Sequence, residues 1–207
     1  MTRTRLYLDE PLPDVAEIEL LAVMGGPMNV YQYRDHSWLR KEKAFLERAI
    51  AAGVPTLGVC LGAQLLADVL GAKVTQNPRV EIGWFPVRLT AEAQDSRLFQ
   101  AMPTEFTAFH WHGDTFDSPP GARRVADSDA CSNQAFEYAG RVVGLQFHLE
   151  YTADSIRSML AHCGHELVDG QFIQGPDQIL AGLGQIGRTR ELLFSLLESM
   201  LPQEKTV

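Results

Sequence analysis

The stretch PTLGVCLGAQ, residues 55–64, decides the fold. Its first half is an apolar strand, and helical periodicity begins directly after the cysteine. This is the Gly-x-Cys-x-Gly form of the nucleophile elbow, in which the reactive side chain occupies the sharp turn from strand to helix. Gly58 and Gly62 suit that turn because side chains there would collide with the neighbouring strand and helix. The stretch therefore predicts a strand–turn–helix unit with Cys60 at the turn.

A cysteine in this place has two interpretations. A helix N-terminus favours the thiolate form of Cys60, and the Leu61 N–H would point to where an oxyanion forms. The alternative is a small buried hydrophobic residue, the common state of a free cysteine. The two flanking glycines, the turn position and the preceding Pro55 favour the nucleophile.

Outward from the elbow, apolar runs alternate with helical periodicity and then give way to short strands. Alternating strands and helices with short connections predict a parallel sheet covered by helices on both faces. We expect one domain over residues 1–207. The expected strands are Arg5–Leu8, Glu19–Met24, Val54–Val59, Ile82–Leu89, Phe106–His110, Arg123–Ala126, Ala135–Tyr138 and Val142–Phe147, and the expected helices lie between Ser37 and Gly53, over Gln64–Leu70, near Ala153–Glu166 and over Arg188–Leu201.

A general base for Cys60 is expected in VGLQFHLE, residues 143–150. His148 ends an apolar strand, and the carboxyl ends of strands are where open α/β sheets gather their active sites. Glu150, two residues on, can return to the imidazole and orient it. The alternative is a strand-end histidine beside a solvated glutamate. Together with Cys60, the pattern favours a catalytic triad.

The composition of the chain limits the classes of partner that it is expected to bind. The chain has 207 residues, 45% of them hydrophobic and 21% charged, as in an ordinary globular protein. A formal net charge of -8 argues against nucleic-acid binding, which depends on Lys and Arg. No apolar run approaches the roughly 20 residues of a membrane span. An odd number of cysteines without CxxC spacing predicts free thiols and a cytoplasmic location.

Metal binding is the remaining alternative for the histidines. His110 and His112 alternate along one strand, and His162, Cys163 and His165 cluster on a predicted helix. Imidazole and thiolate are good ligands, but no matched pair of ligand spacings is present. We therefore expect no metal and no cofactor.

These motifs together resemble the class I (triad) glutamine amidotransferases, and most closely stand-alone GMP-synthase-like amidotransferase domains. The cysteine stretch matches at every glycine and at Gln64, and residues 146–150 match the histidine–glutamate motif, with Leu149 where proline is commoner. Gly25-Gly26-Pro27 matches an oxyanion loop, and His112-Gly113-Asp114 matches a GMP synthase segment.

The resemblance implies an α/β, flavodoxin-like fold with a mostly parallel central sheet and helices on both faces. The Gly-Gly-Pro loop comes early, so the usual first strand and helix are expected to be missing, with Arg5–Leu8 as one candidate to fill the gap. It also implies site residues by function: a catalytic Cys60, His148 and Glu150, oxyanion donors Gly26 and Leu61, and substrate contacts from Gly25, Gln64, Trp111, His112, Gly113 and Asp114.

The implied activity is that of a glutaminase-type C–N hydrolase, which cleaves glutamine to glutamate and ammonia through a thioester. A synthetase partner would then accept the ammonia. Two alternatives stay open: a γ-glutamyl peptidase or hydrolase with the same triad, and a degenerate binding domain that retains the motifs.

Overall fold

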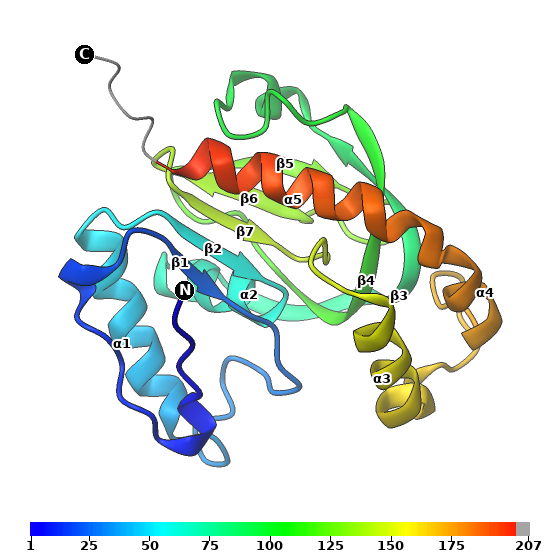
Figure 1. Ribbon diagram of the computed structural model, residues 1–207, viewed down its shortest axis with the longest axis horizontal. Helices are drawn as coiled ribbons and strands as arrows, with labels where there is room; N and C mark the ends of the chain where they lie inside the picture. The colour runs from blue at the N-terminus through cyan, green and yellow to red at the C-terminus, as the bar shows by residue number, and fades with distance from the viewer. Residues whose placement is uncertain (202–207) are drawn as a thin grey trace.

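The computed structural model describes residues 1–201, which contain one seven-stranded sheet in the order β1-β2-β7-β6-β5-β3-β4 (Figure 1). The strands are β1 (Leu21–Val23), β2 (Thr56–Val59), β3 (Val74–Leu89), β4 (Glu105–Phe116), β5 (Ala122–Asp127), β6 (Ala135–Tyr138) and β7 (Val142–Leu145). The α-helices are α1 (Trp38–Ala51), α2 (Leu61–Val69), α3 (Ala153–Cys163), α4 (Pro176–Ala181) and α5 (Ile186–Met200).

The sheet combines a parallel part with an antiparallel part. β2 lies between β1 and β7 and is parallel to both. The other four neighbouring pairs are antiparallel. The predicted α/β fold is confirmed, and its parallel character belongs to the part of the sheet that carries the elbow. Short turns can join antiparallel strands, whereas parallel pairs need a crossover such as α1 between β1 and β2.

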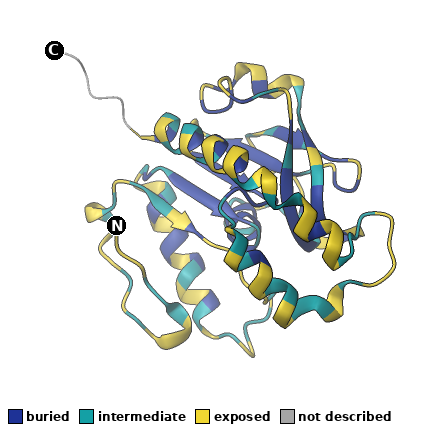
Figure 2. Ribbon diagram, turned by 45° about the vertical axis from the view of Figure 1, so that its right-hand side comes forward, coloured by how far each residue is buried: buried dark blue, intermediate teal, exposed yellow. Residues whose placement is uncertain are grey.

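Helices cover both faces of the sheet, as predicted. On one face, Leu192 and Leu196 of α5 pack with Leu57 and Leu145 in a single buried cluster. On the other face, Leu46 of α1 belongs to a second cluster together with apolar residues of α2. Figure 2 shows the strands as mostly buried and the outer sides of the helices as exposed. Burial of these apolar stripes is the main force that holds helices to the sheet.

A third apolar cluster lies under α3 and α4. It joins Trp84 of β3 and Phe109 of β4 to Ile156 of α3 and Ile179 of α4. The Trp84 indole also donates to the Ile179 carbonyl at 3.0 Å. This packing fixes the outer strands β3 and β4 against the C-terminal helices.

One expectation about secondary structure is wrong, and one helix was not foreseen. Leu6–Leu8 is a 3-10 helix and not a strand, and within the described residues the first strand is β1. The side chain of Glu10 accepts from both the backbone N–H and the guanidinium of Arg5, which closes a local turn in place of sheet pairing. The short helix α4 was not expected at all.

The β3–β4 ladder is interrupted at one place. Gln76 lies opposite Asp114 and Glu81 lies opposite His112, so the intervening residues of β3 bulge away from the partner strand. Gly113 has no register partner on β3. None of the helices described here is long and apolar enough to cross a bilayer.

Candidate active site

Cys60 occupies the turn between β2 and α2. Its φ of 54° and ψ of -109° lie in a region that non-glycine residues seldom adopt. The turn is tight on both sides. A Cβ built at Gly62 would lie 2.0 Å from the Val23 carbonyl oxygen, and one at Gly58 would lie 2.5 Å from the Gly62 oxygen. Only glycine fits at either position, which accounts for the Gly-x-Cys-x-Gly pattern.

His148 lies just beyond β7, the parallel neighbour of β2. Its backbone is held by two hydrogen bonds with Phe109 of β4, at 2.8 and 3.3 Å. Its Nδ1 lies 2.7 Å from Oε1 of Glu150. The other carboxylate oxygen of Glu150 accepts from the Leu149 N–H at 3.0 Å. The Tyr151 ring meets the imidazole edge-on, with centroids 4.6 Å apart. The imidazole is therefore held by its backbone, by Glu150 and by Tyr151.

Cys60 and His148 meet at Gly25, in the loop after β1. A Cβ built on Gly25 would lie 3.4 Å from the Cβ of Cys60 and 3.6 Å from Cε1 of His148. Neighbouring strands of one sheet thus deliver a thiol, an imidazole and a carboxylate to the same edge.

The electrostatics of this group favour a charged imidazole. Burial alone would lower the pKa of His148. The charge of Glu150 and the hydrogen bonds with Cys60 and Glu150 outweigh burial and raise that pKa to about 10. Burial would likewise raise the pKa of Glu150, but the charge and hydrogen bond of His148 bring it below its usual value. An imidazolium next to a thiol is the arrangement that stabilises a thiolate.

The predicted oxyanion donors lie side by side. Leu61 is the first residue of α2, where N–H groups have no partner within the helix. Gly26 adjoins it, since a Cβ built there would lie 3.1 Å from the Leu61 side chain. The structure thus brings the loop after β1 to the N-terminus of α2.

Some of the predicted substrate-contact residues lie in two places. Trp111 and Gly113 are on β4, and Gln64 is on α2. Trp111 presents its carbonyl oxygen to Sγ of Cys60 at 3.8 Å, while its indole turns away and donates to Glu166 at 2.8 Å. Gly113 follows on the same strand. Gln64 is buried, and its amide donates to Gln146 at 3.0 Å. Its side-chain nitrogen is therefore committed within the protein.

Asp114 has a free acceptor. Its Oδ2 is buried and has no hydrogen-bond partner among the described residues. Burial raises the pKa of Asp114, against the effects of a hydrogen bond from Tyr31 and the charge of His112. Tyr31 itself is 54% exposed, which places Asp114 beside the solvent-facing side of the site.

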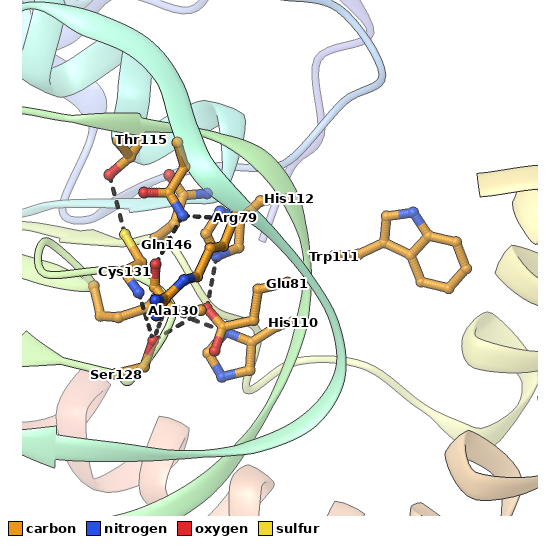
Figure 3. Close-up of polar contacts among 12 residues, drawn as sticks. Arg79, Glu81, His110, Trp111, His112, Thr115, Ser128, Ala130, Cys131 and Gln146 are labelled. Atoms are coloured by element: carbon orange, nitrogen blue, oxygen red, sulfur yellow. Dashed lines mark hydrogen bonds and ion pairs between the residues drawn. The ribbon is translucent and has the colours of Figure 1, made fainter. Parts of the chain in front are cut away.

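One group of the described side chains has the donor atoms of a metal site, namely Glu81, His110 and His112 (Figure 3). All three are buried, and Oε2 of Glu81 lies 3.3 Å from His110 and 3.2 Å from His112. The amide nitrogen of Gln134 lies 2.6 Å from the same oxygen and 3.4 Å from Nδ1 of His110. Because a hydrogen-bond donor already lies between two of the ligand atoms, the group fits a hydrogen-bonded carboxylate better than a metal centre.

Sequence reasoning missed three residues of this region. Glu81 precedes a predicted strand and has no local sign of burial. Tyr151 follows the histidine motif without a pattern of its own. Gln146 was quoted within that motif but was not expected to pair with Gln64.

Comparison with known proteins gives consistent results. The family model described as glutamine amidotransferase class-I matches residues 4–166. A protein of Salmonella typhimurium named as glutamine amidotransferase-like is 34% identical over 172 residues, which are 81% of this chain and 72% of that protein. The glutamine-hydrolyzing GMP synthase of Thermomicrobium roseum is 31% identical over 143 residues, which are 68% of this chain and only 25% of the synthase.

Solved structures share the fold. A glutamine amidotransferase of Thermotoga maritima superposes with a TM-score of 0.85 at 35% identity, covering 95% of this chain and 84% of that chain. A glutamine amidotransferase of Methylobacillus flagellatus gives a TM-score of 0.85 at 31% identity, covering 97% of this chain and 84% of that one.

Proposed function

The chain belongs to the class I glutamine amidotransferase family, and on that premise we propose that it hydrolyses the side-chain amide of L-glutamine to glutamate and ammonia. The observation that carries the proposal is the meeting of Cys60, on its left-handed turn, with the hydrogen-bonded pair His148 and Glu150 around Gly25. These residues come from separate segments, and packing of the core alone does not require them to converge.

The reaction has two halves. In the first, Sγ of Cys60 attacks the amide carbon, and the N–H groups of Leu61 and Gly26 stabilise the oxyanion. His148 gives a proton to the departing nitrogen, the C–N bond breaks, and ammonia leaves a γ-glutamyl thioester. In the second, His148 takes a proton from water, the resulting hydroxide attacks the thioester, and the C–S bond breaks to release glutamate. Glu150 orients the imidazole and stabilises its charge throughout.

The substrate is held by groups around the thiol. The free Oδ2 of Asp114 suits the ammonium of an amino acid, because a buried acceptor without a partner is costly unless a ligand supplies one. Gly25, Gln64 and the backbone of Trp111, His112 and Gly113 form the rest of the contact surface.

A synthetase that accepts ammonia is the proposed partner. GMP synthases named as glutamine-hydrolyzing match this chain over about a quarter of their length, for example 25% and 24%. The remaining length of those synthases lies outside the matched region, and we propose that a synthetase of this kind accepts the ammonia in the cytoplasm.

The decisive experiment measures glutamate release from glutamine and from γ-glutamyl dipeptides. Wild type is compared with Cys60→Ala, and Cys131→Ala serves as the matched thiol control. We expect release from glutamine by wild type and by the control, and none by Cys60→Ala. A strong preference for γ-glutamyl dipeptides would favour the alternative activity, that of a γ-glutamyl hydrolase, over glutaminase activity. Glutamine binding without release would indicate a binding domain, and release that persists in Cys60→Ala would refute the mechanism.

A further inference from the structure

Glu81 is a carboxylate with no exposed surface, and polar atoms of four residues converge on one of its oxygens. Oε2 lies 2.6 Å from the Gln134 amide, 3.2 Å from Ser128 and 3.2 Å from Nε2 of His112, with His110 at 3.3 Å. Burial alone would raise the pKa of Glu81, but the two histidines and the Ser128 hydroxyl outweigh it and lower that pKa. A buried anion of this kind persists only where it is paired and hydrogen-bonded.

His112 supplies the pairing through a ring that faces acceptors on both sides. Its Nδ1 lies 2.9 Å from the Asp114 carbonyl oxygen, and its Nε2 faces Glu81. Both ring nitrogens of His112 therefore lie within hydrogen-bond distance of an oxygen atom. His110 does not make such a link, because its Nδ1 lies 3.4 Å from the Gln134 amide nitrogen and its buried Nε2 has no hydrogen-bond partner among the described residues. The ring of His112 thus ties the backbone of β4 to a side chain of β3.

This tie lies where the backbone ladder is broken. Glu81 and His112 form the register pair that borders the β3 bulge, and Gly113 has no partner across the gap. The same segment of β4 carries the Trp111 carbonyl that faces Cys60 and, further back, the Phe109 backbone that holds His148. Figure 3 shows Glu81, His110 and His112 turned toward one another, with the Trp111 side chain pointing away.

We propose that Glu81 is a positioning residue, which holds residues 111–114 of β4 in the conformation that receives glutamine. The bulge leaves the backbone of Gly113 free for a ligand, and the Glu81–His112 contact replaces the rigidity that ladder hydrogen bonds would give. The inference rests on the proposed function for its substrate, and on the β3–β4 geometry for its mechanism.

The test compares steady-state kinetics with glutamine for wild type, Glu81→Ala and Glu81→Gln. We expect the KM of Glu81→Ala to rise about 10- to 100-fold, the size of a lost hydrogen bond to a charged group, with kcat within about threefold. Glu81→Gln keeps an acceptor oxygen and should fall between the two. Glu137→Gln is the matched control, because Glu137 is a buried carboxylate of β6 held by Ser96 and Arg123. It should lower the melting temperature without moving KM.

Several results would overturn the inference. One is a KM for folded Glu81→Ala that equals the wild-type value. Another is a stoichiometric metal ion in wild type that Glu81→Ala loses, since a cation would then take the place of the ring hydrogens. If neither variant folds, nitrogen NMR of wild-type His112 decides: hydrogen on both ring nitrogens supports the tie, and a single neutral tautomer refutes it. Wild type that neither binds nor hydrolyses glutamine would refute the proposed function instead.

Discussion

Two histidine–carboxylate pairs lie near each other in this protein and differ in what faces the second ring nitrogen. His148 pairs with Glu150 at 2.7 Å, and its other side meets the thiol of Cys60. His112 pairs with Glu81 at 3.2 Å, and its other side meets a backbone carbonyl. The first ring has a partner that can exchange a proton. The second has partners that only accept hydrogen bonds.

The difference shows that a carboxylate beside a histidine does not define a role by itself. A ring becomes an acid–base group when its free nitrogen faces a group that ionises or reacts. A ring with acceptors on both sides is a structural link. The backbone of β4 connects the two pairs, through Phe109 to His148 and through His112 to Glu81.

Replacing each histidine separately by asparagine should produce the largest kinetic difference between the two pairs. We expect His148→Asn to lower kcat for glutamine about 10⁴-fold or more, because both half-reactions lose their proton carrier. His112→Asn should raise KM about tenfold or more while kcat stays within about threefold. Steady-state assays of both variants check this, and similar kinetic changes in the two would abolish the distinction.

Removing the charge of Glu150 should give the next largest effect. Glu150→Gln keeps the shape of the side chain but loses the negative charge that stabilises the imidazolium. We expect kcat to fall about 10²- to 10⁴-fold with KM little changed. Glu81→Gln assayed in parallel should show the opposite division between kcat and KM. A change in KM without a change in kcat for Glu150→Gln would contradict the proposed role of Glu150 in stabilising the imidazolium of His148.

The stability of the first pair should depend on pH. The raised pKa of His148, about 10 in place of 6.5, stabilises the fold fully below about pH 6.5, and this contribution is lost as the pH rises through 10. The lowered pKa of Glu150 contributes above its usual value of 4.5 and is lost in acid. The melting temperature of Glu150→Gln should therefore fall furthest below wild type between about pH 4.5 and 6.5. Thermal melts from pH 4 to 10 measure the difference in melting temperature between wild type and Glu150→Gln. A difference that does not change with pH would refute the proposed pH dependence of stability.

The smallest effect is expected at Tyr151, which packs edge-on against His148. Tyr151→Ala should lower kcat/KM roughly 2- to 10-fold, the size of a lost aromatic contact. Tyr151→Phe keeps the ring and should stay within about twofold of wild type. A large loss in the phenylalanine variant would show that the hydroxyl takes part in the reaction.

The parallel part of the fold could be predicted because its signals are local. Residues 55–64 carry a strand, a turn and a helix in one stretch, and the periodicity of α1 and α5 is long enough to recognise. The segment Arg5–Leu8 misled because the contacts of Arg5 with Glu10 decide its conformation. Helix α4 is too short to show a helical period.

The residues of the site likewise divide into those that local sequence motifs indicate and those that only the fold brings together. Cys60, His148 and Glu150 lie in motifs whose glycines and spacing carry information. Glu81 could not be found, because a glutamate before an apolar strand is ordinarily solvated and only the fold of β4 and the Gln134 segment encloses it. The pairing of β2 with β7, which brings the thiol to the imidazole, depends on an order of strands that no local pattern records.

The close approach of Gly62 to the Val23 carbonyl has a consequence for protein engineering. Strand β1, the Gly25–Gly26 loop and the start of α2 are locked together at van der Waals contact, so none of the three can be reshaped alone. Grafting a loop from a relative to change substrate range would have to transfer all three as one cassette. New specificity is better sought around Tyr31, which is 54% exposed and lies outside this tightly packed region.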